Sequence, residues 1–207
     1  MKKVFITLGL TFFMLINLPA SIYRGDIQCE LGYSANKIDN KKNIQALKTD
    51  NFNFGIQTWQ LFGSSDFFYA GFMVNNELGF GNSRPNSEYT DSKYIYNSYS
   101  LIGPAIALDF FGAVRISFAT GFATAGNFAN YDNSTIANAN FGIGLDVQAK
   151  FLSKFFVSPI IGYRFASTFG NTTSIIIDSS RDIDVYVDSG KTQTMKNEFY
   201  AGISFNW

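Results

Sequence analysis

Eight ionisable residues occupy the polar side of segments in which apolar and polar residues alternate. Five are acids and three are bases: Glu30, Glu77, Asp109, Asp146 and Glu198, and Arg115, Lys150 and Arg164. If these segments enclose one interior, the eight side chains converge in it. Opposite charges in a narrow, dry space should pair, because an unpaired buried charge costs several kcal/mol. The sequence thus predicts a network of ion pairs.

The chemistry expected of these residues is ion pairing, and not catalysis. The sequence contains no histidine, the side chain that most often acts as a general base near neutral pH. No serine or threonine nucleophile stands beside a plausible base. We therefore predict that the chain is not an enzyme and uses no cofactor; a serine–lysine or carboxylate-only mechanism is the remaining alternative.

A second group of acids lies near the end of the chain. The stretch 175–188 reads as two short apolar strands around a polar turn. We predict contacts with a surface or host ligand from its residues Asp182, Asp184, Tyr186 and Asp188. Three aspartates on one face could also bind a hard cation through oxygen ligands. The spacing of a calcium loop is absent, so a solvated acidic face is the favoured reading and no metal site is predicted.

The composition indicates a membrane protein built of strands. Hydrophobic residues make up 46% of the 207 residues, aromatic residues 17% and charged residues only 15%, against about 25% charged residues in soluble domains. After residue 20 no apolar run reaches the roughly 18 residues that a membrane helix needs. The net charge is zero without a basic cluster, which argues against nucleic-acid binding. A single cysteine, Cys29, excludes an intrachain disulfide.

The first twenty residues have the layout of a secretory signal peptide. Lys2 and Lys3 precede an uncharged apolar stretch at 4–18, and Pro19-Ala20-Ser21 supplies small residues for cleavage. We predict a signal peptide at 1–20, with 25 as an alternative limit, and one domain at 26–207. An uncleaved anchor is less favoured, because fifteen apolar residues are short for a membrane span.

Beyond the signal, eight segments alternate with period two, as strands with two different faces do. They are 27–34, 52–57, 68–74, 102–110, 114–122, 141–148, 157–165 and 199–207. Each carries a glycine on its polar face: Gly32, Gly55, Gly71, Gly103, Gly121, Gly142, Gly162 and Gly202. Glycines repeated on one face fit the crowded interior of a small closed barrel. Pro104 and Pro159 interrupt strands and each predict a bulge or a lost ladder bond.

The connections between these segments alternate between short and long. Short turns are expected around 63–65, at Gly112 and at 153–154, and long polar links at 35–50, 81–93, 126–138 and 168–196. Bacterial outer-membrane barrels have short turns on one side and long loops on the other. The pattern predicts an all-β fold: a closed, antiparallel, eight-stranded up-and-down transmembrane β-barrel with short periplasmic turns and long extracellular loops.

Alternation alone leaves open which face points inward, since a soluble lipocalin-like barrel would bury the apolar face. Aromatic residues near the short-turn ends favour the membrane orientation, as an interfacial girdle: Phe62, Phe110, Phe151, Phe155 and Trp207. A tyrosine-rich stretch precedes the fourth segment: Tyr89, Tyr94, Tyr96 and Tyr99. We interpret it as the outer interfacial belt rather than as an adhesive surface.

The last segment alternates and closes on an aromatic residue, which resembles the C-terminal signal read by the barrel-assembly machinery. Its outward residues are Phe199, Ile203, Phe205 and Trp207. Residues 26–207 as a whole resemble the small eight-stranded outer-membrane barrels (OmpX-like, OmpW-like and OmpA-transmembrane proteins) and an uncharacterised treponemal family. The resemblance rests on architecture. It implies an outer-membrane location, contact with outer-membrane lipid and with the barrel-assembly machinery, and a monomer as the favoured state.

Two functions follow from this reading. The first is a structural or surface-interaction role through the long loops, with the lumen plugged by its charge pairs. The alternative is a narrow channel or pocket for small molecules, apolar ones included, because eight inward glycines remove side-chain volume from the lumen.

Overall fold

The computed structural model describes residues 22–40, 47–63, 65–85, 93–131, 134–176, 184–186 and 191–207. These residues form nine strands, and no helix occurs within these ranges. The strands are β1 (Ile22–Asn40), β2 (Leu47–Gly63), β3 (Phe68–Pro85), β4 (Lys93–Phe110), β5 (Val114–Tyr131), β6 (Ser134–Phe151), β7 (Val157–Ile176), β8 (Asp184–Tyr186) and β9 (Lys191–Asn206). The predicted signal peptide at 1–20 lies outside the described residues, and β1 begins four residues before the predicted domain boundary at 26.

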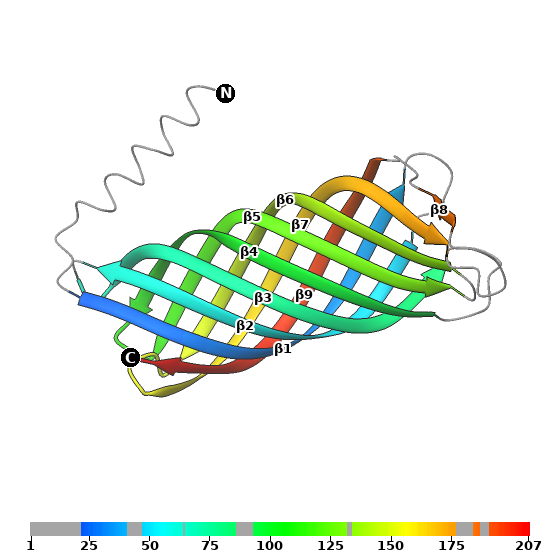
Figure 1. The fold of residues 1–207 in the computed structure, drawn as a ribbon. Coiled ribbons are helices and arrows are strands. Elements are labelled where there is room, and N and C mark those ends of the chain that lie inside the picture. The colour runs from blue at the N-terminus through cyan, green and yellow to red at the C-terminus, as the bar shows by residue number, and fades with distance from the viewer. Residues whose placement is uncertain are drawn as a thin grey trace, which may run out of the picture.

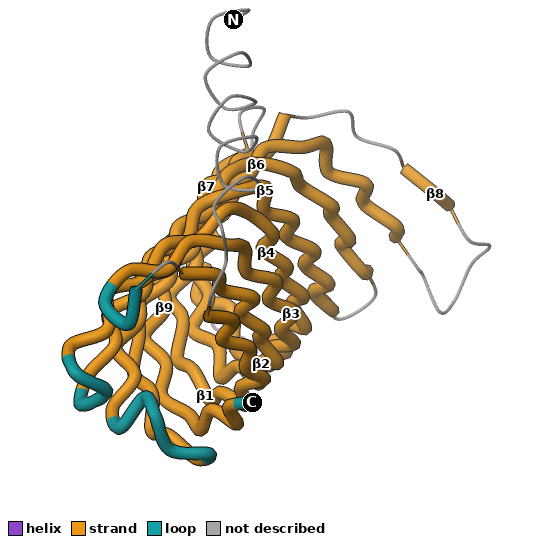
Figure 2. Tube along the Cα trace, turned by 90° about the vertical axis from the view of Figure 1, so that its left-hand side faces the viewer, coloured by secondary structure: helices purple, strands orange, loops and turns teal. Residues whose placement is uncertain are grey.

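Eight of the nine strands close into one antiparallel barrel (Figure 1). Each strand from β2 to β7 pairs with its predecessor, and β9 closes the ring by pairing with both β7 and β1. The short strand β8 pairs with the end of β7, where Ile175 faces Val185. Figure 2 shows β8 beside the loop-side end of the barrel. The predicted eight-stranded barrel is confirmed.

The strands are staggered around the barrel. A path that follows paired residues from Glu30 on β1 through all eight strands returns to β1 at Asn40, ten residues nearer the loop side. Strand number, stagger and tilt are linked in a closed barrel. The stagger therefore accounts for the strong inclination of the strands seen in Figure 1.

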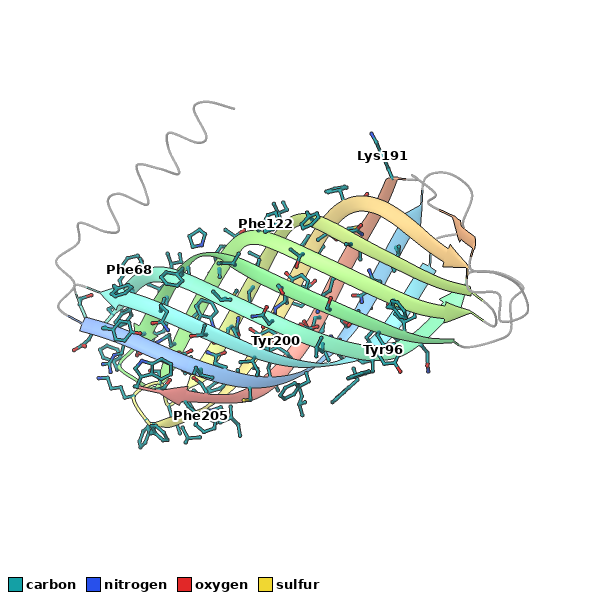
Figure 3. All side chains as sticks on the ribbon, viewed as in Figure 1. Phe68, Tyr96, Phe122, Lys191, Tyr200 and Phe205 are labelled. Atoms are coloured by element: carbon teal, nitrogen blue, oxygen red, sulfur yellow. The ribbon has the colours of Figure 1, made fainter. Side chains whose placement is uncertain are left out.

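The apolar face of the strands points outward. In β6, for example, Phe141 and Ile143 are exposed, whereas Gly144 and Asp146 are buried. Figure 3 shows the same division: Phe68, Phe122 and Phe205 project from the wall, and Tyr200 lies within the barrel. This is the orientation of a membrane barrel, in which lipid meets the apolar face.

Aromatic side chains surround the short-turn end. All five residues of the predicted girdle are exposed there: Phe62, Phe110, Phe151, Phe155 and Trp207. Phe67, Phe111 and Phe156 in the turns are exposed as well. At the opposite end of the barrel Tyr96 lies on the outer face and packs edge-to-face against Phe80, with 5.5 Å between ring centroids. Tyr89 lies outside the described residues. Aromatic residues thus occupy both predicted interfaces.

The short turns lie where the sequence predicts them. The turn between β4 and β5 needs two left-handed residues, Phe111 with φ 58° and Gly112 with φ 77°. Its geometry is held by Asp109, whose carboxylate accepts a hydrogen bond of 2.7 Å from the Gly112 N–H. A glycine suits this position because it adopts positive φ without steric cost.

The predicted long links are shorter than expected, because the strands continue into them. The clearest correction concerns 126–138: β5 and β6 stay paired through Tyr131 and Ser134, which leaves only 132–133 between them. Likewise β7 extends to Ile176 and β9 starts at Lys191. Backbone ladders form irrespective of side-chain polarity, so the loss of apolar alternation marked the end of the lipid-facing part and not of the strand.

Neither proline produces a bulge. The β4–β5 register is the same on both sides of Pro104, but the ladder omits residues 103 and 104, between Ile102↔Phe122 and Ala105↔Ala119. Both omitted pairs need an N–H at residue 104, which proline lacks. Pro159 pairs with Ile203 of β9 and lies beyond Ile160, the last β7 residue paired with β6. Of the two predicted consequences, the lost ladder bond is therefore the one observed at Pro104.

Candidate functional site in the barrel lumen

The lumen holds every residue of the predicted charge network. All eight are buried and project inward from seven different strands: Glu30, Glu77, Asp109, Arg115, Asp146, Lys150, Arg164 and Glu198. They separate into two groups, one in the middle of the lumen and one near the short-turn end. The strand stagger decides this grouping, because it sets which residues of distant strands lie at one height.

The central group is organised by Arg164 of β7, which is fully buried. Its Nη1 lies 2.7 Å from Glu77, 2.8 Å from Glu30 and 3.1 Å from Glu198. Its Nε lies 2.9 Å from Asp146. The four carboxylates come from β1, β3, β6 and β9, so one guanidinium links five strands across the interior.

A second cation, Lys196 of β9, completes the central group. It pairs with Glu77 and with Glu198, the latter at 3.1 Å. Sequence reasoning missed Lys196, because 168–196 was interpreted as a loop. Its position on the polar side of a longer final strand would have identified it, had the strand been extended upstream of residue 199.

Two tyrosine rings lie beside these cations. Arg164 stands 4.6 Å from the ring centroid of Tyr200 and 5.9 Å from that of Tyr99, and Lys196 stands 4.4 Å from Tyr99. Cations placed over aromatic faces are attracted by the ring quadrupole. The prediction that Tyr99 belongs to the outer belt is wrong: it is only 3% exposed and lines the lumen. Its odd spacing from Tyr96 places the two side chains on opposite faces of β4.

The central group contains four carboxylates and two cations, so neutral donors supply the remaining stabilisation. Asn53 donates to Glu198 at 2.8 Å, and the Tyr200 hydroxyl donates to Asp146 at 2.7 Å. Hydrogen bonds to charged groups are about twice as strong as neutral ones. Because two cations cannot neutralise four carboxylates, these neutral donors stabilise the remaining negative charge.

The second group lies at the short-turn end. Arg115 is 3.3 Å from Asp109 and 3.8 Å from Asp26, and Lys150 pairs with Asp26. Ser153 donates to Asp109 at 2.6 Å. Asp26 was not predicted, because the first segment was taken to begin at 27, although the same alternation continues through it.

The space between the two groups is filled. The amides of Gln28 and Gln148 exchange hydrogen bonds, and a cluster of buried side chains, among them Trp59, Tyr69 and Leu101, occupies the lumen beside them. The volume released by the inward glycines is also used. Glu198 packs against Gly32, Glu30 against Gly55 and Tyr200 against Gly162.

The other predicted sites are less fully described. Asp182 and Asp188 lie outside the described residues, while Asp184 and Tyr186 bound β8, whose backbone alone is placed. The residues of the predicted assembly signal all lie on the outer face of the last strand or directly after it: Phe199, Ile203, Phe205 and Trp207. Within the described ranges, no group of three or more His, Cys, Asp or Glu side chains is arranged to hold a metal ion.

Three solved structures share this architecture. Neisserial surface protein A is 11% identical with a TM-score of 0.52, and the match covers 87% of this chain and 96% of that chain. The outer membrane protein OprG from Pseudomonas aeruginosa is 8% identical with a TM-score of 0.53, covering 88% and 95%. The outer membrane protein AlkL, determined in DMPC lipid bilayers, is 9% identical with a TM-score of 0.51, covering 89% of each chain. The chain has the fold of the small outer-membrane β-barrels.

Identities this low establish the fold alone. No model of a protein family matches the sequence, and no curated protein matches it. The narrower resemblance to a treponemal family finds no support in these comparisons. Among the residues that the structure describes, no helix is both long and apolar enough to cross a bilayer.

Proposed function

We propose that this protein resides in the outer membrane as a barrel with a sealed, structural lumen, and that its loop side makes surface contacts. The observation that carries the proposal is the contact of Arg164 with carboxylates from four other strands. Opening a pore would separate these paired charges, which together link five strands. The lumen therefore serves to hold the wall together.

The loop side supplies the surface for contact. Barrel strands of 16–20 residues exceed the roughly 9–11 residues that span a bilayer, so part of each strand rises above it. On this side β8 is the last strand of the sheet: it pairs with β7, and no other described strand lies along its second edge. The last strand of a sheet order can accept a further strand from a partner protein. Asp182, Asp184, Tyr186 and Asp188 are the proposed contact residues of this segment.

Conductance separates this function from the alternative of a narrow channel. Purified protein inserted in a planar bilayer is expected to leave the current flat, because the ion pairs and packed side chains close the lumen. A general porin added to the same bilayer shows that insertion and recording work. Discrete current steps from the wild-type chain would instead favour the channel.

Replacement of the β8 segment tests the contact role. Residues 178–189 exchanged for a short Gly-Ser turn would remove β8 and its pairs with β7 but leave the β7–β9 ladder intact, whereas a deletion of 172–194 would cut into both strands. Bacteria that display this variant are expected to adhere less to immobilised serum proteins than bacteria that display the wild type. Equal adherence, with equal display, would contradict the contact role while leaving the sealed lumen in place.

A further inference from the structure

A cavity of about 240 Å³ opens at the short-turn end of the barrel. Its lining includes three cationic side chains, Arg24, Arg115 and Lys154, together with Ser153, Asn206 and Trp207. The cations come from β1, from β5 and from the turn between β6 and β7. A concave site with several cations from separate elements has the composition expected of an anion site.

The three cations differ in how far they are already neutralised. Arg115 forms the base of the cavity and is paired with Asp26 and Asp109. Lys154 has no carboxylate within 4.0 Å in the described part of the chain, and its stem lies against Gly112 of the neighbouring turn. Among the described carboxylates Arg24 pairs with Asp66 alone, at 4.0 Å, and the Asp66 side chain is 69% exposed. The cavity therefore holds one cation without a carboxylate partner, Lys154, and one that is weakly paired, Arg24.

Arg24 also carries an unmet hydrogen-bond donor. Its Nε is buried and has no partner among the described residues. Buried donors almost always have a partner, so an exception calls for an explanation such as a bound ion or water. A guanidinium presents its donors as a planar fork that matches two oxygens of a phosphate.

We propose that this cavity binds a phosphate oxyanion through Arg24 and Lys154, beside the ion-paired Arg115. Phe156 and Trp207 border the cavity and are exposed, as aromatic residues at a membrane interface are. Phospholipid headgroups occupy that level, so the phosphate comes either from a lipid headgroup or from free phosphate in the periplasm. The proposal does not depend on the surface-contact function.

The chain offers a built-in reporter for the first test. It contains two tryptophans, and Trp59→Phe leaves Trp207 at the cavity as the single tryptophan, which can be excited selectively over the tyrosines. Inorganic phosphate added to this protein in a non-ionic detergent is expected to change its emission in a saturable way. Arg24→Gln or Lys154→Gln should weaken the response by roughly tenfold, the effect of losing one charge-assisted hydrogen bond. Calorimetry on the chain with both tryptophans repeats the titration independently of the Trp59 change.

The controls separate binding from screening and from misfolding. Lys191→Gln removes an exposed cation at the far end of the barrel (Figure 3) and should leave the titration unchanged. Sodium chloride at equal ionic strength should not reproduce the response. A gel comparison of heated and unheated protein shows that each variant is folded.

Native mass spectrometry distinguishes the two sources of phosphate. If the ligand is a lipid headgroup, one phospholipid should stay bound to the wild type, be displaced by phosphate, and be lost from the Arg24→Gln and Lys154→Gln variants. If it is free phosphate, no lipid is retained but the titration saturates. The absence of both a retained lipid and a saturable titration would overturn the proposal, as would a response in both variants as strong as that of the wild type.

Discussion

At the scale of single residues, Arg164 has the largest consequence for this barrel. It is fully buried and contacts four carboxylates from four strands. Replacing Arg164 alone destabilises the barrel, because it leaves its four carboxylates buried without their cationic partner. Lys196 cannot compensate, since of the four it reaches only Glu77 and Glu198.

We therefore expect Arg164→Met to lower the free energy of unfolding by about 3–5 kcal/mol, the usual consequence of leaving buried charges unpaired. Urea titration of the protein in lipid vesicles, followed by tryptophan fluorescence, measures this change. Lys191→Gln is the matched control: it removes an exposed cation and should alter the free energy of unfolding by no more than about 0.5 kcal/mol. A loss below about 1 kcal/mol for Arg164→Met would show that the central group is not a structural link.

For single residues, the sequence predicted well which face of the wall a side chain lies on, but it did not predict which residues pair with each other. Alternation placed Glu30, Asp146 and Arg164 on the inner face. It could not show that Glu77 would meet an arginine 87 residues later in the chain. Asp26 and Lys196 were missed for another reason: the expected strands were too short at their ends.

At the scale of elements, the β4–β5 ladder lacks the pairs of residues 103 and 104, and a substitution of Pro104 could restore them. Ile102 and Phe122 pair on one side of it and Ala105 and Ala119 on the other, in unchanged register. The outer face at Pro104 is exposed and apolar. The position should therefore accept a β-branched residue that restores the missing N–H.

Pro104→Val is expected to raise the free energy of unfolding by about 1 kcal/mol, the net contribution of one hydrogen bond. The same urea titration measures the gain. Ala201→Val is the control, because Ala201 is exposed on the outer face of β9, where the ladders to β1 and β7 are already continuous, so a valine there adds no ladder bond. Equal gains from both substitutions would mean that valine acts through strand propensity and not through the ladder.

At the scale of the whole molecule, closure of the ring governs behaviour. Because β9 pairs with both β1 and β7, the eight barrel strands that the structure describes form a ring without a free edge, and β8 pairs with the end of β7 outside this ring. A closed barrel resists detergent and stays compact until it is heated. Its outer surface is apolar over most of its length, so it also needs detergent or lipid to stay dispersed.

We expect the refolded mature protein to migrate faster on a detergent gel when unheated than after boiling, and to give a strand-rich circular dichroism spectrum. Arg24→Gln should behave like the wild type in both measurements, because Arg24 contributes no short contact to the wall. A protein that stayed monomeric and folded without detergent would contradict the outward placement of the apolar face.

The sequence by itself determined the number of barrel strands and the side of the wall to which the residues of each alternating segment belong, because side-chain direction alternates along a strand whatever the strand pairs with. The aromatic girdle and the alternating connection lengths indicated that the apolar side faces lipid. The tertiary structure decided which charges meet. A stagger of ten residues around the ring brings Glu30 of β1 and Glu77 of β3 to the height of Arg164 on β7, and this stagger arises from the pairing of all eight strands together. No segment read alone contains it.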